Sequence, residues 1–354
     1  MPDEQEAKAT EDRKIQHINI ILTKETQYRE KTTMLECVHV EPRGGAISNK
    51  DVDVSSIILG RRVAAPLFIS GMTGGHPVAF QINKNIAEAA SKLGIPMGVG
   101  SQRAMAENQS LSYTYNIKKY SPELVLIGNM GASRLPAYTN EQIEGILDYI
   151  KADMFAIHTN PGQESVQPEG DLDFRGVMER IKRLKPEIKQ SIIVKEVGNG
   201  ISKEVAASLN GAADAIDVQG AGGTTWIGVE TYRSKGSYGE AFWDWGIPTA
   251  LSVLECKSAF SGPVFSSGGI RSALDIIRSI SIGASACGMA KPVIMSERKG
   301  GAEGVYNFMK GTMDGLKEIM AEMGFENIEQ LRNAKVSFSE PLSSVLEQRG
   351  ILTK

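Results

Sequence analysis

Residues 156–171, "AIHTNPGQESVQPEGD", carry several side chains that can do chemistry directly after an apolar run. His158 can exchange a proton near neutral pH, although a single histidine in such a place is more often a hydrogen-bonded structural residue. Asn160 and Gln163 offer amide groups to a ligand. Glu164 offers a carboxylate, which makes a normal Mg²⁺ site together with phosphate oxygens and waters. The stretch therefore indicates metal binding, phosphate binding or proton transfer.

Polar side chains also follow two earlier apolar runs. Ser101, Gln102 and Arg103 come directly after "PMGVG", and Asn129 lies near the end of "LVLIGNMG". The guanidinium of Arg103 is suited to phosphate oxygens in bidentate geometry. A surface salt bridge would explain this arginine equally well, so the segment by itself leaves both interpretations open.

Lys195 and Glu196 interrupt a third apolar run, "SIIVKEVG". The alternation of side chains along a strand turns one of the two inward. A lysine in an apolar interior is unfavourable unless an anion lies beside it. A structural Lys–Glu pair is the alternative, but we favour an anionic ligand next to Lys195.

Glycine-rich turns follow two later runs, in "GAGGTTW" (220–226) and "SSGGIRSALD" (266–275). Backbone N–H groups at such a turn, followed by a helix N-terminus, form a phosphate site. An earlier segment, "SGMTGGH" (70–76), could approach a flat ring closely, although a tight turn explains it as well. With Lys195 near the negative charge of a reduced ring, these turns describe a site for flavin mononucleotide (FMN).

These polar ends belong to a repeated pattern in which short apolar runs alternate with amphipathic, helix-like segments. Eight units over about 250 residues are typical of a (β/α)8 barrel of the α/β class, whose chemistry lies at the C-terminal ends of the strands. Continuous apolar runs are expected of parallel strands that are covered on both faces. A doubly wound sheet would show fewer strands and one glycine fingerprint. The runs are 66–72, 96–101, 124–131, 154–160, 191–198, 215–223, 263–270 and 284–293.

The flanking segments predict one barrel domain over residues 13–354. Residues 1–12 are polar and read as a disordered tail. Residues 13–63 form an N-terminal extension with short strands, such as "MLECVHV", and residues 324–354 form a C-terminal helical tail.

Composition excludes several classes of protein and of site. The chain has 354 residues, 41% of them hydrophobic, which is enough for a full core. The net charge of -3 provides no general field for nucleic acid or an anionic membrane. Three cysteines without a CxxC pair argue against a disulfide framework or a thiolate zinc site, and fit a reducing cytoplasm. The polar N-terminus lacks a signal-peptide core, and no window approaches the roughly 20 apolar residues of a membrane span.

The combined motifs resemble the type 2 isopentenyl diphosphate isomerases, FMN-dependent enzymes of isoprenoid synthesis. The resemblance covers almost the whole chain, whereas "GGIR" alone also occurs in other barrels such as IMP dehydrogenase. It implies interconversion of isopentenyl and dimethylallyl diphosphate, with N5 of reduced FMN as the main acid–base centre, Mg²⁺ on the diphosphate, NAD(P)H as flavin reductant, and a homotetramer or homo-octamer. The motifs are "RKIQHI" (13–18), "GMTGG" (71–75), "GSQRA" (100–104), "IHTNPGQESVQPEGD" (157–171), "VKEVGNGIS" (194–202), "GAGGTTW" (220–226), "GIPTA" (246–250), "GGIRSALD" (268–275) and "GMAKP" (288–292).

The resemblance also implies roles for individual residues. His158 and Gln163 would act near the proton transfer, and Glu164 would be the magnesium ligand. The substrate contacts would be Arg13, Lys14, His17, Ser101, Gln102, Arg103, Asn160, Gln163 and Trp226. The FMN contacts would be Met72, Thr73, Gly74, Ser101, Asn129, Lys195, Thr225, Gly269, Ile270, Arg271, Ala290 and Lys291. Ile15, Gln16, Thr159 and Gly162 depart from the pattern, but the polar set is intact.

Two other functions compete with this interpretation. An IMP dehydrogenase needs a cysteine nucleophile in a glycine-rich loop, which "GAGGTTW" lacks, and a hydroxy-acid oxidase needs a histidine base beside the flavin, for which the fourth strand is an odd place. A barrel that only stores flavin would have no use for Arg13, Lys14 and His17, or for Glu164.

Overall fold

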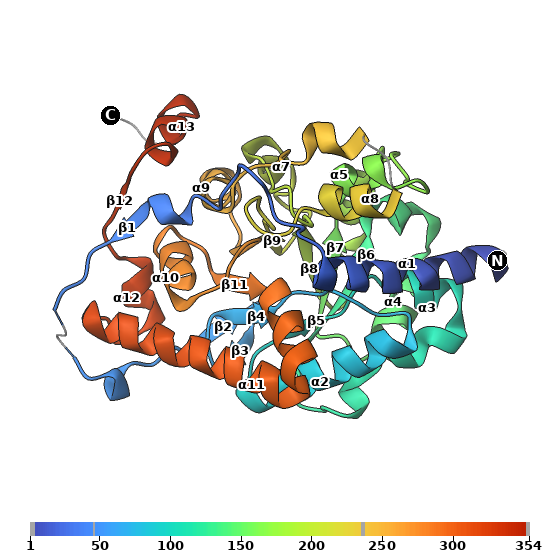
Figure 1. Cartoon of the computed structure of the whole chain (residues 1–354), viewed down its shortest axis with the longest axis horizontal. Helices are drawn as coiled ribbons and strands as arrows, with labels where there is room; N and C mark the ends of the chain where they lie inside the picture. The colour runs from blue at the N-terminus through green and yellow to red at the C-terminus, as the bar shows by residue number, and fades with distance from the viewer. Residues whose placement is uncertain (1–3, 45–46, 235–237, 352–354) are drawn as a thin grey trace.

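The computed structural model describes residues 4–44, 47–234 and 238–351, with residues 4–12 described as backbone only. Eight parallel strands form a closed barrel in the order β10-β11-β4-β5-β6-β7-β8-β9 (Figure 1). This confirms the expected (β/α)8 architecture, and each strand lies within its predicted apolar run. The strands are β4 (Leu67–Ile69), β5 (Met97–Gly98), β6 (Leu126–Gly131), β7 (Met154–His158), β8 (Ser191–Lys195), β9 (Ala215–Asp217), β10 (Val264–Ser267) and β11 (Ala286–Met289).

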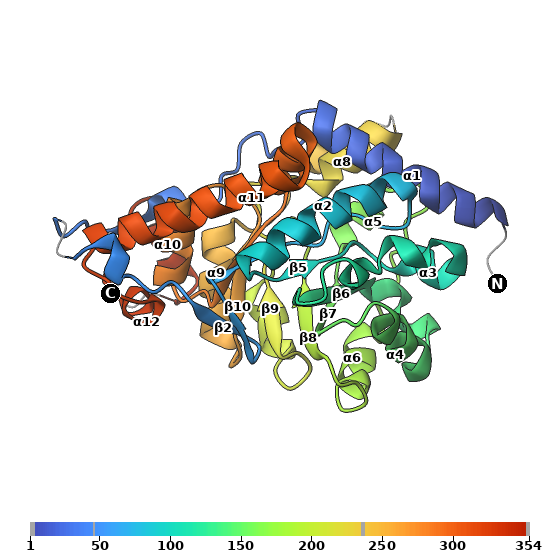
Figure 2. The same ribbon diagram turned by 90° about the horizontal axis from the view of Figure 1, so that it is seen from below.

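Helices surround the strands and cover the outer face of the barrel. Figure 2 shows α2 and α11 packed side by side along one flank. The segment between β5 and β6, which has no clear sequence pattern, holds the short helix α3 (Arg103–Glu107) and the 3-10 turns η3 (Gln109–Thr114) and η4 (Ile117–Lys119). The other outer helices are α2 (Pro77–Leu93), α4 (Asn140–Tyr149), α6 (Val177–Leu184), α7 (Lys203–Ser208), α9 (Thr249–Ala259), α10 (Ala273–Ser281) and α11 (Lys291–Glu322).

Two further helices, α5 (Pro161–Val166) and α8 (Trp226–Ser234), lie in the loops after β7 and β9 and contact each other. Helix α5 lies within the motif 157–171, and α8 begins at the last residue of the motif 220–226. The polar residues that leave these strands therefore continue into short helices at the same end of the barrel. Pro161 is favourable at the first turn of α5 because its missing N–H would have no intrahelical acceptor there.

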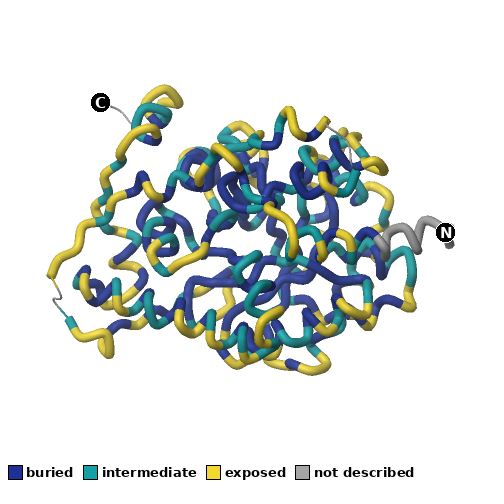
Figure 3. Tube along the Cα trace, in the orientation of Figure 1, coloured by how far each residue is buried: buried dark blue, intermediate teal, exposed yellow. Residues whose placement is uncertain are grey.

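A hairpin closes the end of the barrel where the strands begin. It consists of the antiparallel strands β2 (Ser56–Ile58) and β3 (Arg61–Val63). Ile58 and Val63 pack into one apolar cluster with barrel-lining side chains such as Phe68 and Phe265. Figure 3 shows the buried residues concentrated in this central region. The opposite end, where the strands finish, is therefore the end open to ligands.

The two terminal segments meet in a small sheet of their own. Strand β1 (Val38–Val40) pairs antiparallel with β12 (Val336–Phe338), where the sequence predicts a purely helical tail. Valine and phenylalanine favour a paired strand, and the partner lies roughly 300 residues away, so no local pattern reveals it. The rest of the tail is helical, in α12 (Ile328–Arg332) and α13 (Leu342–Gln348).

The N-terminal helix begins earlier than the sequence predicts. Helix α1 spans Glu4–Thr23 and so includes residues 4–12, which were expected to be disordered. Glutamate, alanine, lysine and glutamine have high helix propensity, and a docked segment beyond residue 13 removes the cost of nucleation. Residues 1–3 of the expected tail lie outside the described residues. Within the described ranges, no helix is both long and apolar enough to cross a membrane.

The hairpin that closes the barrel makes a stability prediction. Ile58 is 2% exposed and its neighbour Ile57 is 67% exposed. Ile58→Ala should lower the free energy of unfolding by about 2–5 kcal/mol because it leaves a cavity in the core. The matched control Ile57→Ala should change it by less than about 0.5 kcal/mol. Denaturant unfolding of the two variants checks this, and equal effects would contradict the assigned packing.

Candidate active site

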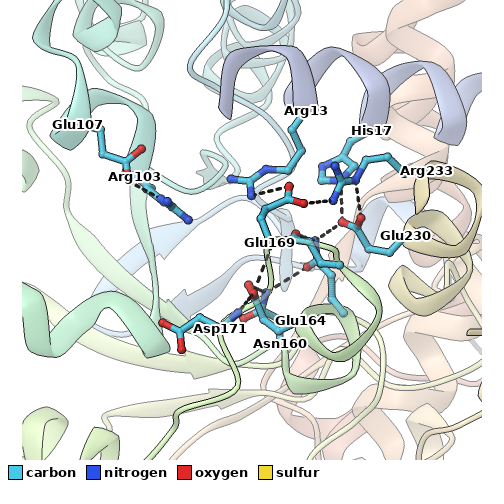
Figure 4. Close-up of polar contacts among 12 residues, drawn as sticks. Arg13, His17, Arg103, Glu107, Asn160, Glu164, Glu169, Asp171, Glu230 and Arg233 are labelled. Carbon is cyan, nitrogen blue, oxygen red and sulfur yellow. Dashed lines mark hydrogen bonds and ion pairs between the residues drawn. The ribbon is translucent and has the colours of Figure 1, made fainter. Parts of the chain in front are cut away.

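A single cavity collects most of the predicted site residues at the C-terminal ends of the strands. Its walls come from α1, the loops after β4, β5 and β7, strands β6 and β8, helices α5 and α8, and the start of α11. Figure 4 shows how residues of α1, α5 and α8 converge in this region. The predicted residues that line the cavity are Arg13, Lys14, His17, Met72, Thr73, Ser101, Arg103, Asn129, His158, Asn160, Gln163, Glu164, Lys195, Trp226, Ala290 and Lys291.

Helix α1 carries the basic residues of the N-terminal motif to the cavity. Arg13 and His17 lie one helical turn apart and so share a face. The helix is anchored by the segment that follows it, since the N–H of Thr225 donates to the carbonyl of Thr26 at 2.8 Å. The N–H of Tyr28 likewise donates to the carbonyl of Gly223 at 3.2 Å. The glycine turn before α8 therefore fixes where α1 lies.

Lys14 is the most strongly perturbed cation of this face. Burial lowers its pKa to about 7, and the nearby charges of Arg13 and Arg103 add to the effect. A lysine in this state is only partly charged at neutral pH, and an anion beside it would restore its charge. Lys14 is thus suited to a multiply charged anion.

Glu230 in α8 joins three segments of the site and was not found from the sequence. It has no exposed surface, and its Oε1 lies 2.8 Å from Nε2 of His17 and 3.0 Å from Nε2 of Gln163. Its Oε2 accepts from Nε of Arg233 at 2.6 Å. Burial would raise the pKa of Glu230, but the bonds with His17, Gln163 and Arg233 outweigh it and lower the pKa to about 2. The carboxylate is therefore charged throughout the physiological range.

His17 completes this network on the side of α1. Burial lowers its pKa, while the hydrogen bond with Glu230 opposes the effect. Its ring meets Trp226 edge-on, with 5.1 Å between the ring centres. Trp226 therefore supports His17 and also forms part of the cavity wall.

His158 is oriented by a hydrogen bond with Asn129. Its Nδ1 lies 2.8 Å from Oδ1 of Asn129, whose Nδ2 donates to the carbonyl of Val99 at 3.1 Å. Since this amide oxygen can only accept, Nδ1 of His158 is the donor and Nε2 carries a lone pair. Burial, together with the charges of Lys195 and Lys14, holds the pKa of His158 well below its usual range. His158 can therefore accept a hydrogen bond but is not a cationic acid in this structure.

Lys195 points into the barrel, as strand alternation allows. It is 7% exposed, and its Nζ donates to the backbone carbonyl of Glu196 at 2.9 Å. The carboxylate of Glu196 instead accepts from the backbone N–H groups of residues 197–199, so the two side chains do not form the structural pair considered above. Burial lowers the pKa of Lys195, and the charge of Asp217, its neighbour across the strands on β9, offsets part of this shift.

The carboxylate of Glu164 faces an amide rather than a second acid. Its Oε1 accepts from Nδ2 of Asn160 at 2.8 Å, and its Oε2 accepts from the N–H of Asp171 at 2.8 Å. Oδ1 of Asn160 is buried without a hydrogen-bond partner among the described residues. Among all the residues that the structure describes, no three or more His, Cys, Asp or Glu side chains form a group that could hold a metal ion. The oxygens fit Mg²⁺ if phosphate and water complete its shell.

Several features of the cavity fit a flavin. Oγ1 of Thr73 is buried without a partner among the described residues, so it can bond to a ligand. Ala290 and Lys291 bring the N-terminus of the long helix α11 to the cavity wall. Such a terminus favours an anion. Lys195 supplies a buried cation on the barrel axis side.

Six predicted residues do not line this cavity: Gly74, Gln102, Thr225, Gly269, Ile270 and Arg271. Gly269 and Arg271 border a separate hollow beside residues 27–33, where the guanidinium of Arg271 donates to the carbonyls of Gly269 and Gly222. Thr225 is fully buried at the start of α8.

Gln102 supports the site from behind. It has no exposed surface, its Oε1 accepts from the N–H of Asn129 at 2.9 Å, and its Nε2 donates to the carbonyl of Ile146 at 3.4 Å. In this structure Gln102 supports Asn129 and does not line the cavity, whereas the family resemblance implied a substrate contact. Its neighbours Ser101 and Arg103 do reach the cavity.

Comparison with known proteins gives this geometry a family. Residues 150–338 match the family model described as FMN-dependent dehydrogenase. The chain is 41% identical over 346 residues to the isopentenyl-diphosphate delta-isomerase of Methanothermobacter thermautotrophicus, covering 97% of both proteins. The chain belongs to the type 2 isopentenyl-diphosphate delta-isomerases. The enzyme of that name from Pyrococcus furiosus is 40% identical over 351 residues, covering 95% of this chain and 89% of the relative.

Solved structures extend the relationship at the level of the fold. A flavocytochrome b2 variant superposes with a TM-score of 0.67 at 14% identity, covering 96% of this chain and 88% of that one. A mandelate oxidase variant superposes with a TM-score of 0.64 at 17% identity, covering 91% and 95%. At this level of identity the likeness shows the barrel fold that type 2 isomerases share with these flavoproteins.

The low pKa of Lys14 predicts pH-dependent anion binding. Protonated Lys14 binds an anion better, so as pH rises through about 7 the lysine loses its proton and affinity falls. The dissociation constant for inorganic pyrophosphate should rise, approaching about tenfold per pH unit above 7. Calorimetric titrations between pH 6 and 8.5 measure this.

Lys14→Arg is the matched control, because arginine stays charged over this range. The pH dependence of its dissociation constant therefore reflects the titration of pyrophosphate and of other protein groups, without that of residue 14. If the wild-type and Lys14→Arg profiles are parallel, Lys14 does not titrate in this window.

Proposed function

We propose that this protein interconverts isopentenyl diphosphate and dimethylallyl diphosphate, with reduced FMN as acid–base cofactor and Mg²⁺ on the diphosphate. One observation carries the proposal: the basic face of α1 and the carboxylate of Glu164 border the same cavity as the buried Lys195. A metal-diphosphate end and a flavin end would thus share one site. The 41% identity to an isopentenyl-diphosphate delta-isomerase over nearly the whole chain supports the same reaction.

The diphosphate would bind between α1 and α5. Arg13, Lys14 and Arg103 supply positive charge at the cavity wall. Glu164 and the unpaired Oδ1 of Asn160 would hold Mg²⁺ together with phosphate oxygens. Arg103 is already oriented, since its Nε donates to Oε1 of Glu107 at 2.5 Å.

The hydrocarbon end would lie against apolar walls. Ile18, Met72 and Trp226 line the cavity and offer mainly apolar surface to an alkene. Isomerisation requires a proton to be added at one carbon and removed at another, and the positive charge that develops is tertiary. A cavity that excludes water protects such a charge from capture.

FMN would be held by Lys195, Asn129 and Thr73 on the ring side and by Ala290 and Lys291 on the phosphate side. When bound and reduced, FMN supplies the proton-exchanging centre and a negative charge near the developing cation. The neutral His158 and the amide of Gln163 would orient the reacting groups and accept hydrogen bonds. The double-bond shift involves no net redox change, so NAD(P)H would serve only to reduce the flavin beforehand.

The test of the function is an anaerobic incubation in D2O. FMN-reduced protein with Mg²⁺ should convert isopentenyl diphosphate to dimethylallyl diphosphate and incorporate deuterium, because the added proton comes from exchangeable sites. Oxidised protein should give no product. Turnover of lactate or IMP instead, or isomerisation without flavin, would contradict the assignment.

The metal assignment predicts a specific effect of Glu164→Gln. The amide keeps the shape but loses the charge that attracts Mg²⁺, so the Mg²⁺ concentration for half-maximal activity should rise by about tenfold or more. FMN affinity, measured by flavin fluorescence, should stay the same, which serves as the internal control. An unchanged Mg²⁺ requirement would place the metal elsewhere.

A further inference from the structure

A continuous chain of ion pairs, which ends in a hydrogen bond between Glu230 and His17, connects α1 to two loops of the barrel mouth. Nη1 of Arg13 lies 3.3 Å from Oε1 of Glu169, and Oε2 of Glu169 lies 2.7 Å from Nη2 of Arg233. Arg233 also donates through Nε to Glu230, which is bonded to His17. We name these five residues the clamp. Figure 4 shows them as one connected group between α1 and α8.

The clamp holds one turn of α1 at both ends. Arg13 and His17 are four residues apart, and each contacts a different carboxylate. Arg233 bridges these two carboxylates, at 2.7 Å from Glu169 and 2.6 Å from Glu230. The side chain of Arg233 is 12% exposed and that of Arg13 is 10% exposed, whereas that of Glu169 is 45% exposed. The two guanidinium groups are therefore largely buried, and the carboxylate that joins them is in contact with water.

Glu169 also belongs to the loop that carries the proposed metal ligand. The turn at Gly170 brings the chain so close to α5 that a Cβ there would lie 1.9 Å from the carbonyl oxygen of Glu164. The next residue, Asp171, donates its N–H to the Glu164 carboxylate. The same short turn therefore positions Glu169 of the clamp and the carboxylate of Glu164.

The contact with Glu169 leaves Arg13 able to bind an anion. A guanidinium carries five N–H donors, and Glu169 engages it through Nη1 alone. Arg13 also lines the cavity. The pair thus fixes the position of the guanidinium and leaves donors for a ligand.

We propose that Glu169 and Arg233 are positioning residues that hold the anion-binding face of α1 over the cavity. The identity of the anion as a diphosphate rests on the proposed function. Neither residue needs to touch the substrate. The alternative is that Glu169 competes with the diphosphate for Arg13. The two possibilities predict opposite effects of Glu169→Gln on substrate affinity, because removing a competitor would strengthen substrate binding.

The first measurement follows α1 directly and does not depend on turnover. In FMN-bound protein without substrate, Glu169→Gln and Arg233→Gln should each speed hydrogen exchange of the amides of residues 13–23 by about tenfold, since each removes a contact that docks α1 on the barrel. The rest of the barrel should exchange as before. Arg233→Lys should restore part of the protection because it retains the charge.

The second measurement separates binding from chemistry. Glu169→Gln should raise KM for isopentenyl diphosphate by about tenfold with kcat changed less than about threefold, because α1 presents binding groups. The KM of the double variant Arg13→Gln/Glu169→Gln should be little higher than that of Arg13→Gln alone, since both substitutions break the same Arg13–Glu169 contact. Asp173→Asn is the matched control: it removes an exposed pair with Arg175 in the same loop and should change neither quantity.

Three results would overturn the proposal: unchanged exchange in α1, a lower KM in Glu169→Gln, or additive effects in the double variant. If the wild-type protein has no isomerase activity, the proposed function is refuted. The exchange measurement would still test whether Glu169 and Arg233 hold α1 in place. If Arg233→Gln fails to fold, Glu169→Gln and Arg233→Lys give the same decision.

Discussion

A carboxylate with no exposed surface constrains the whole mouth of this barrel. Glu230 is charged and buried, and such a group is stable only when its partners are in place. The partners come from α1, from α5 and from its own helix, through His17, Gln163 and Arg233. Because these segments are distant in sequence, the requirement to compensate one charge brings the N-terminal helix onto the barrel and completes the cavity.

The barrel supplies the other half of the site through strand register. Gly131, His158, Lys195 and Asp217 are aligned across four neighbouring strands, β6 to β9. This row ends the strands at one level, so the neutral ring of His158 and the ammonium of Lys195 face the same space. Lys14 and Lys195 both line the cavity, and burial lowers the pKa of each. An anion bound beside them would stabilise their charged forms. A cavity of this kind is prepared for anionic ligands, and it is the arrangement expected in a family whose members are named for a diphosphate substrate.

The fold and part of the site were readable from the sequence for a simple reason. A parallel strand that is covered on both faces must be apolar along its length. The residues that follow it at its C-terminal end, where the site lies, are free to be polar. The eight runs therefore predicted the eight strands, and the polar ends predicted that Asn129, His158 and Lys195 would meet. The strand β12 was missed because its pairing with β1 joins the two ends of the chain.

The sequence by itself thus determined the barrel, its chemically active end and the kinds of side chain found there, since these depend on local patterns of polarity. Tertiary structure alone decided which polar residues face the cavity. Gln102 lies beneath β6, although its neighbours Ser101 and Arg103 reach the cavity, because adjacent residues in a turn point in different directions. Glu169, Glu230 and Arg233 look like ordinary surface charges in sequence. Their importance comes from packing α1 across them, which buries Glu230 and most of Arg233 and links Glu169 to both α1 and α8.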